Sequence, residues 1–214
     1  MFNDFFSKRG EGQSEGEKPQ QPQRRGSSLG SGFVIDSSGI IVTNNHVIAD
    51  ANDIVVVFND RTELKAELVG KDPKVDLAVL RVKPVKPLKS VKFADSGAVR
   101  VGDWVLAIGN PFGFGGSVSV GIVSAKNRQI GSGPYESYLQ TDAAINRGNS
   151  GGPLFDMNGD VLGINTAIVS PSGGSIGIGF SVPSALAKPV IDQLIAFGET
   201  RRGWLGVRDR KSVV

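Results

Sequence analysis

Short apolar runs separated by turn residues constrain the fold of this chain more than any other feature. The runs at 33–35 and 40–43 flank Asp-Ser-Ser-Gly, and those at 153–157 and 161–168 flank Asn158-Gly159, which suits a type I′ hairpin. Further strands are expected at 54–58, 62–69, 77–82, 104–108, 117–124, 138–141 and 179–182. Many short strands of this kind favour β-barrels over a doubly wound sheet.

One segment alone predicts a helix. Apolar side chains recur at helical spacing between Pro183 and Phe197, and Gly198 supplies a stop. Pro189 lies inside the segment and is expected to kink the helix or delay its start. The sequence therefore predicts an all-β chain with a C-terminal helix.

Composition narrows the class of protein further. The 214 residues are 39% hydrophobic, which is enough for one large all-β domain or two small ones. Cysteine is absent, so disulfides, thiolate nucleophiles and cysteine-based metal sites are excluded. The net charge of +3 comes from scattered basic residues without stacking aromatics, which argues against nucleic-acid binding. The sequence contains no apolar run of membrane-spanning length, and no signal peptide is evident at its start.

Residue usage also predicts the domain boundaries. Residues 1–28 are poor in apolar residues and are expected to be disordered, although Phe2, Phe5 and Phe6 either anchor on a neighbouring subunit or form a frayed end. A stretch rich in Pro and Lys near 83–97 is expected to join two barrels. These barrels are predicted at about 29–90 and 91–182, with the helix at 183–197.

The first chemical signal is Ser150, which is flanked by glycines in Gly148-Asn149-Ser150-Gly151-Gly152-Pro153. A sharp turn there lets the N–H groups of Gly148 and Ser150 point at one spot, with Asn149 between them. Acyl transfer needs such donors for the oxyanion that develops in the transition state. Taken alone, the segment also fits an ordinary glycine-rich turn.

His46 and Asp76 are the candidates for activating this serine. His46 is the only histidine, so any imidazole base must be this residue, although a lone histidine is more often a core or surface residue. Asp76 opens an apolar strand, where an unpaired carboxylate is costly to bury and a histidine N–H would compensate. Asp72 is the competitor, but it precedes Pro73 and fits a turn. The order His, Asp, Ser places the site between the two barrels.

Gly148-x-Ser150-x-Gly152 also matches the nucleophile elbow of α/β-hydrolases. An elbow is followed by a helix, and its histidine comes after the serine. Pro153 and a predicted hairpin follow here, and no histidine lies beyond position 46. The esterase or lipase interpretation is therefore rejected.

The chain resembles the HtrA family of serine proteases from about residue 29 to 207. The matching stretches are LGSGFVI at 29–35, VTNNHVI at 42–48, GKDPKVDLAVL at 70–80, RVGDWVLAIGNPFG at 100–113, QTDAAINRGNSGGPL at 140–154 and IGIGFSVP at 176–183. The resemblance implies a trypsin-like double β-barrel with the triad His46, Asp76 and Ser150. It also implies an oxyanion hole at Gly148, Asn149 and Ser150.

The resemblance implies further properties of function. The protein is expected to cleave unfolded or misfolded proteins in the periplasm without ATP, and to need no metal or cofactor. It is also expected to act as a trimer or a larger assembly. Ile145, Ile168 and Ile178 are expected to line a specificity pocket for small aliphatic side chains, because burying an unpaired charge there is expensive. Three loops, 126–137, 143–149 and 168–177, are expected to carry regulation, with Arg128 as a sensor contact and glycines that permit switching.

Two departures from the family leave alternatives open. The family has an opening strand before a flexible loop, so the first barrel is expected to lack a strand and expose an edge. The family also continues into PDZ modules, whereas residues 208–214 do not follow its pattern. Two alternatives to a serine endopeptidase are therefore left open. One is a module that holds unfolded chains without cutting them, and the other is a fragment that does not fold alone.

Overall fold

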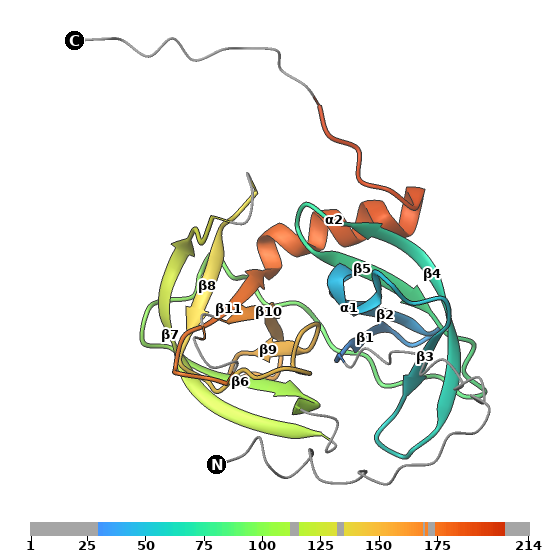
Figure 1. Ribbon diagram of the computed structural model, residues 1–214, viewed down its shortest axis with the longest axis horizontal. Helices are drawn as coiled ribbons and strands as arrows, with labels where there is room; N and C mark the ends of the chain where they lie inside the picture. Colours follow the sequence, from blue (N-terminus) through green and yellow to red (C-terminus); the bar gives the residue numbers. More distant parts are fainter. Residues whose placement is uncertain (1–29, 112–115, 132–134, 169, 171–173, 204–214) are drawn as a thin grey trace, which may run out of the picture.

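Two β-structured units lie side by side in the computed structural model, and a helix crosses from one to the other (Figure 1). The structure describes residues 30–111, 116–131, 135–168, 170 and 174–203. The segment 1–28 and the tail 208–214 lie outside the described residues, so the predictions made for them stay predictions.

The first unit is an open antiparallel sheet with the strand order β1-β2-β5-β4-β3. Its strands are β1 (Phe33–Asp36), β2 (Ile40–Thr43), β3 (Ile54–Val57), β4 (Glu63–Asp72) and β5 (Leu77–Arg81). Strand β2 is buried along its whole length because β1 and β5 flank it and the second unit packs against it. Among the described residues, β1 and β3 are the two edges of this sheet, so the first unit is a half-barrel there. The prediction that it lacks an opening strand stays a prediction.

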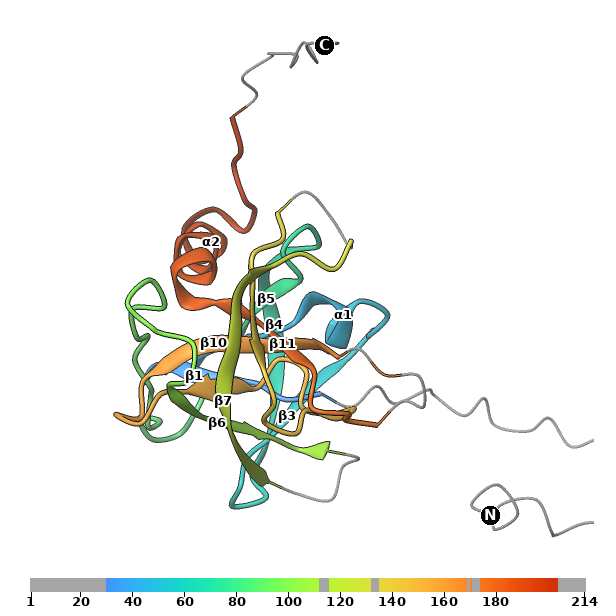
Figure 2. The ribbon, with the colours of Figure 1, turned by 90° about the vertical axis from the view of Figure 1, so that its left-hand side faces the viewer.

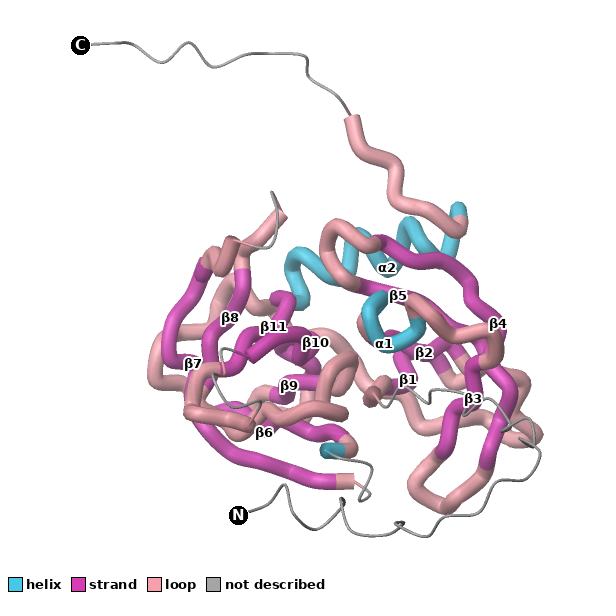
Figure 3. Tube along the Cα trace, in the orientation of Figure 1, coloured by secondary structure: helices cyan, strands magenta, loops and turns pink. Residues whose placement is uncertain are grey.

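The second unit is a closed barrel with the strand order β10-β11-β8-β7-β6-β9 (Figure 3). Its strands are β6 (Trp104–Gly109), β7 (Ser117–Arg128), β8 (Tyr138–Thr141), β9 (Pro153–Phe155), β10 (Val161–Ile168) and β11 (Gly179–Pro183). All its strand pairs are antiparallel. The connection between the two units runs from 82 to 103 and bonds to both, since Val91 N–H donates to Val34 O and Ala94 N–H to Val161 O.

The β9–β10 hairpin forms where the sequence predicted it, but its turn is not type I′. A type I′ turn needs positive φ at both central residues. Here Gly159 alone has positive φ (83°), and Asn158 is not among the non-glycine residues with positive φ. Asp156 O accepts Gly159 N–H at 3.2 Å, and the Asp156 carboxylate accepts the N–H groups of Asn158 and Asp160. This side chain therefore selects a longer turn that ends in a left-handed glycine.

The C-terminal helix α2 spans Ser184–Phe197, close to its predicted bounds, and Pro189 lies inside it. Gly198 ends the helix in the left-handed conformation, with φ of 75° and an N–H bond to Leu194 O. The prediction of a single helix was wrong, because a four-residue helix, α1 (Asn45–Ile48), follows β2. Four residues are too few to show helical periodicity. No helix in the described part of the chain is long and apolar enough to cross a bilayer.

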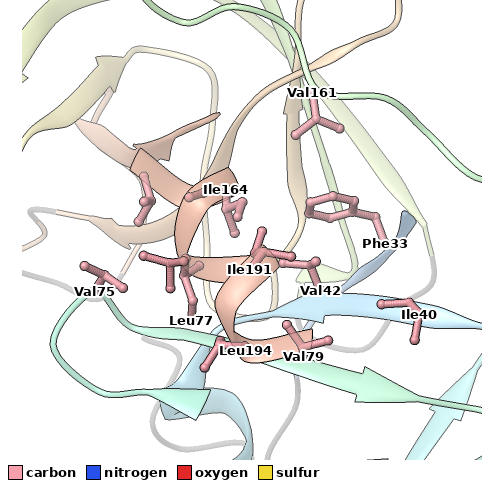
Figure 4. Close-up of a cluster of buried hydrophobic side chains, with 13 residues drawn as sticks. Phe33, Ile40, Val42, Val75, Leu77, Val79, Val161, Ile164, Ile191 and Leu194 are labelled. Atoms are coloured by element: carbon pink, nitrogen blue, oxygen red, sulfur yellow. The ribbon is translucent and has the colours of Figure 1, made fainter. Parts of the chain in front are cut away.

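The largest hydrophobic cluster joins the two units rather than filling either one alone (Figure 4). It combines side chains from β1, β2 and β5 with side chains from β10, β11 and α2. The buried members are Phe33, Ile40, Val42, Val75, Leu77, Val79, Val161, Ile164, Val182, Ala187, Val190, Ile191 and Leu194. Helix α2 packs against β4, β5 and β10, and in Figure 2 it lies above β10. This shared core fixes the position of β2 and α1 relative to β10, and therefore the geometry of the site between them.

Candidate active site

His46 and Asp76 form a direct pair at the end of the first sheet. His46 Nδ1 lies 2.6 Å from Asp76 Oδ2, so the ring nitrogen that faces the carboxylate carries a proton. The second ring nitrogen, Nε2, is then the one able to accept a proton from a substrate or nucleophile. The imidazole is about half exposed, with a side-chain exposure of 49%, so it is accessible from solvent.

Asp76 holds the short helix that carries the histidine, through both its backbone and its side chain. Asp76 O accepts Asn45 N–H at 3.2 Å and the side-chain amide of Asn44 at 2.7 Å, while Asp76 Oδ1 accepts His46 N–H at 2.9 Å. These contacts satisfy N–H groups at the start of α1 that have no partner within the helix. Asp76 has φ of 57°, a left-handed conformation that is unfavourable outside glycine and is found at functional sites when the surroundings enforce it.

Ser150 lies in a tight turn before β9. Gly148 and Gly151 have φ of 100° and 85°, which side chains larger than glycine rarely adopt. A Cβ on Gly151 would lie 2.3 Å from Ser31 O, so the two segments approach too closely for any other residue. The turn is tied to β10 because Gly151 N–H donates to Asn165 O and Asn165 N–H donates to Gly152 O.

Thr166 links the serine turn to the carboxylate, and the sequence analysis missed it. Its hydroxyl donates to Asp76 Oδ2 at 2.6 Å, while its carbonyl oxygen lies 3.5 Å from the Ser150 hydroxyl. A β-bulge between Asn165 and Ala167 contains Thr166 and re-aims its side chain toward the first sheet. Two adjacent polar residues in an otherwise apolar strand were the signal that could have drawn attention to it.

The structure therefore pairs His46 with Asp76 and joins Asp76 to the Ser150 turn through Thr166, but not in one continuous chain of hydrogen bonds. Within the described residues, Ser150 and His46 are not joined by a hydrogen bond, and the 3.5 Å contact to Thr166 O holds the serine hydroxyl weakly. Catalytic hydrogen bonds are often long before substrate binds. The N–H groups of Gly148 and Ser150, predicted to form an oxyanion hole, donate to no acceptor in the described part of the chain. Asn149, between them in sequence, is buried, and its side-chain amide lies 3.4 Å from Ala144 O.

The three predicted pocket residues surround Gly179 at the start of β11. Gly179 pairs with Ile168 across the sheet and follows Ile178 directly. The Ile145 side chain lies 2.8 Å from the position that a Cβ on Gly179 would occupy. Ile145 is 2% exposed and belongs to the barrel core, whereas Ile168 and Ile178 are partly exposed. The apolar surroundings fit the predicted preference, which stays a prediction.

Arg128 lies at the end of β7, where its Nε donates to Gln140 Oε1 on β8 at 3.0 Å. It therefore braces the base of the 126–137 loop. Of the three predicted regulatory loops, 126–137 and 168–177 each contain residues outside the described part of the chain, including Pro171 and Gly173. Asn146 connects the 143–149 and 168–177 loops, because its Oδ1 accepts Ser175 N–H at 2.8 Å.

Asp72, the rejected competitor of Asp76, is a buried structural carboxylate. Its Oδ1 accepts Lys74 N–H at 2.9 Å, as expected of a turn residue, while its Oδ2 accepts Thr200 Oγ1 and the guanidinium of Arg202. Burial opposes the charge, but the bonds from Arg202, Thr200 and Lys74 N–H outweigh burial and hold the pKa of Asp72 below its ordinary value. Arg202 also lies over the Tyr135 ring, 4.6 Å from its centroid. Asp72 therefore anchors the segment after α2.

Two β-units that meet at an imidazole–carboxylate pair and a glycine-flanked serine define the trypsin-like class of protein. A family profile described as "Trypsin-like peptidase domain" matches residues 30–164. The chain belongs to this family.

Curated relatives and solved structures agree with this assignment. The chain is 54% identical over 215 residues to a "Probable periplasmic serine endoprotease DegP-like" of Brucella suis biovar 1 (strain 1330), covering 97% of the chain. It is 60% identical over 179 residues to a protein of the same name from Rhizobium meliloti (strain 1021), covering 84% of the chain. A solved structure, "HtrA-type protease AlgW with decapeptide", matches with a TM-score of 0.80 and 52% identity, over 84% of this chain and 55% of that one. The chain spans 42% of the Brucella relative and 36% of the Rhizobium relative.

Proposed function

We propose that this chain is the proteolytic part of a serine endopeptidase, with Ser150 as nucleophile, His46 as general base and Asp76 as the carboxylate that orients the base. The observation that carries the proposal is the 2.6 Å bond between His46 Nδ1 and Asp76 Oδ2, linked through Thr166 to the Ser150 turn. This pairing fixes the tautomer in which Nε2 is free to accept a proton.

The reaction follows from these roles. His46 Nε2 takes the Ser150 hydroxyl proton while the oxygen attacks a peptide carbonyl, and Asp76 stabilises the resulting imidazolium. His46 then protonates the leaving amine, and water hydrolyses the acyl-enzyme by the same steps. The N–H groups of Gly148 and Ser150 stabilise the oxyanion, each contributing on the order of 10²–10³ in rate. All of these steps use groups of this chain and a water molecule.

The substrates that we propose are unfolded or misfolded proteins in the periplasm, cut without ATP. The names of the relatives place those proteins in the periplasm and call them endoproteases. The apolar side chains around Gly179 favour cleavage after Val or Ala over cleavage after Arg or Lys. A peptide library tests this preference, and dominant cleavage after a basic residue would exclude it.

The experiment that tests the activity compares the wild type with Ser150→Ala. We expect a fluorophosphonate probe to label the wild type at Ser150, and we expect casein to be cleaved by the wild type alone. If both proteins bind unfolded casein and neither cuts it, the chain is a binding module rather than a protease. A cooperative thermal transition, measured on the same samples, excludes the third alternative that the chain does not fold alone.

We also propose that the intact protein forms homo-oligomers through the outer face of β6 and β7. Three cross-strand pairs make this face wholly apolar, namely Trp104 with Ile122, Leu106 with Val120 and Ile108 with Val118. Trp104, Val118 and Val120 are each more than half exposed. An uncharged apolar face is best covered by a similar face, which a second copy of the chain supplies.

Analytical ultracentrifugation tests this contact. We expect Trp104→Lys to lower the mass of the assembly, whereas Val85→Lys, at an exposed apolar residue outside the face, leaves the mass unchanged. A wild type that stays monomeric at high concentration would exclude the proposed assembly.

A further inference from the structure

Ser31 connects the serine turn with both β-units. Its hydroxyl donates to Gly148 O at 2.6 Å and accepts Asn110 N–H at 2.9 Å. Its backbone N–H donates to Ser150 O at 2.8 Å, and its carbonyl accepts the Thr43 hydroxyl at 2.7 Å. One partly buried residue before β1 therefore contacts β2, the end of β6 and the turn that carries the nucleophile.

The hydrogen bonds of the turn show which of its peptide groups Ser31 fixes. The peptide between Gly148 and Asn149 is held at both ends, by Ser31 Oγ on its carbonyl and by Asn146 O, which accepts Asn149 N–H at 3.0 Å. The peptide between Ser150 and Gly151 is held by Ser31 N–H and by Asn165 O. Ser31 thus supplies one of the two anchors on each of these groups.

The preceding peptide, between Arg147 and Gly148, has no hydrogen bond at either end among the described residues. Its N–H is one of the two proposed oxyanion donors, and Gly148 with φ of 100° offers little resistance to rotation. The direction of this N–H therefore depends on how firmly the next peptide is held. The Ser31 hydroxyl is the side-chain group that holds it.

We propose that Ser31 is a positioning residue for the oxyanion turn, whose hydroxyl keeps the Gly148 N–H directed at the reacting carbonyl. This inference rests on the proposed protease activity. Removing the hydroxyl leaves Gly148 O without this donor and lowers the population of the correctly formed turn. One hydrogen bond of this kind changes such a population by roughly two- to twelve-fold.

The test compares Ser31→Ala with Ser184→Ala, because Ser184 has a closely matched hydroxyl elsewhere in the fold. Ser184 Oγ donates to Ala94 O at 2.6 Å and accepts Ser96 N–H at 3.2 Å, at the start of α2. Both substitutions remove one donor and one acceptor, so both should lower the thermal midpoint. The loss of turnover should be specific to Ser31→Ala.

Three measurements are made on each protein. For fluorescent casein, we expect kcat of Ser31→Ala to fall roughly two- to twelve-fold with KM within about two-fold of the wild type. The rate of fluorophosphonate labelling should fall by a similar factor, because the adduct also places an oxygen in the oxyanion hole. Hydrogen–deuterium exchange should become faster across residues 144–152 in this variant and stay at the wild-type rate in Ser184→Ala.

The outcomes separate the two proposals. Equal kcat and equal exchange over 144–152 in Ser31→Ala and Ser184→Ala would overturn the role of Ser31, even if the wild type is an active protease. A wild type as inert as Ser150→Ala would overturn the protease proposal. In that case the exchange data still decide whether Ser31 orders the turn.

Discussion

Replacing Thr166 by valine removes the one side-chain donor that β10 offers to the Asp76 carboxylate. Valine keeps nearly the same shape, so the bulge and the packing of β10 should persist. The lost interaction is the 2.6 Å bond from Thr166 Oγ1 to Asp76 Oδ2, and Thr166 is only 9% exposed. Among the described residues, Asp76 Oδ2 then keeps His46 Nδ1 as its one remaining partner.

The size of the effect follows from the kind of bond. Hydrogen bonds to charged groups contribute about 1.5–3 kcal/mol. If the full energy of this bond stabilises the transition state, where His46 becomes an imidazolium, its loss raises the activation free energy by that amount. At about 1.4 kcal/mol per factor of ten, kcat should then fall about 10- to 150-fold. KM should change little, because Thr166 holds the carboxylate rather than a substrate.

Steady-state cleavage of fluorescent casein measures both constants, and Thr166→Ser is the matched control because it keeps the hydroxyl. We expect Thr166→Ser to retain most of the wild-type kcat. The reasoning is refuted if Thr166→Val folds normally and keeps kcat within two-fold of the wild type. Such a result would mean that the backbone contacts of Asp76 suffice to orient it.

Two predictions concern stability. Asp72→Asn leaves Arg202 without its carboxylate and should lower the free energy of unfolding by about 2–3 kcal/mol at pH 7 in urea denaturation. Because the folded pKa of Asp72 lies below its ordinary value of 3.8, its contribution is present above pH 3.8 and is lost as the pH falls through that lower pKa. If Asp72→Asn lowered the free energy of unfolding in strong acid by as much as at pH 7, this assignment would be contradicted. Leu194→Ala, at a fully buried site in the shared core, should lower the free energy of unfolding by about 2–5 kcal/mol, whereas Ile195→Ala, at the exposed neighbouring position, should lower it far less.

Local patterns in the sequence were sufficient for the strands, the long helix and the sharp turn at Ser150, whereas the catalytic roles of the site residues stay a proposal. Alternating and continuous apolar runs reflect burial directly, so β2, β5 and β10 lie close to the predicted ranges. The glycines around Ser150 predicted a sharp turn, and Gly148 and Gly151 do adopt positive φ. A single histidine left one choice of base, and the structure places that residue 2.6 Å from Asp76.

Contacts between segments distant in sequence could be decided only by the tertiary structure. Helix α1 forms because Asp76, 30 residues away, accepts the N–H group of His46. Thr166 reaches Asp76 through a bulge across 90 residues, and Ser31 reaches Gly148 across 117. Sequence periodicity reports which side chains are buried, but not their partners. Those partners are set when the two sheets and α2 close over one shared core, because that packing brings β1, β2 and β10 together.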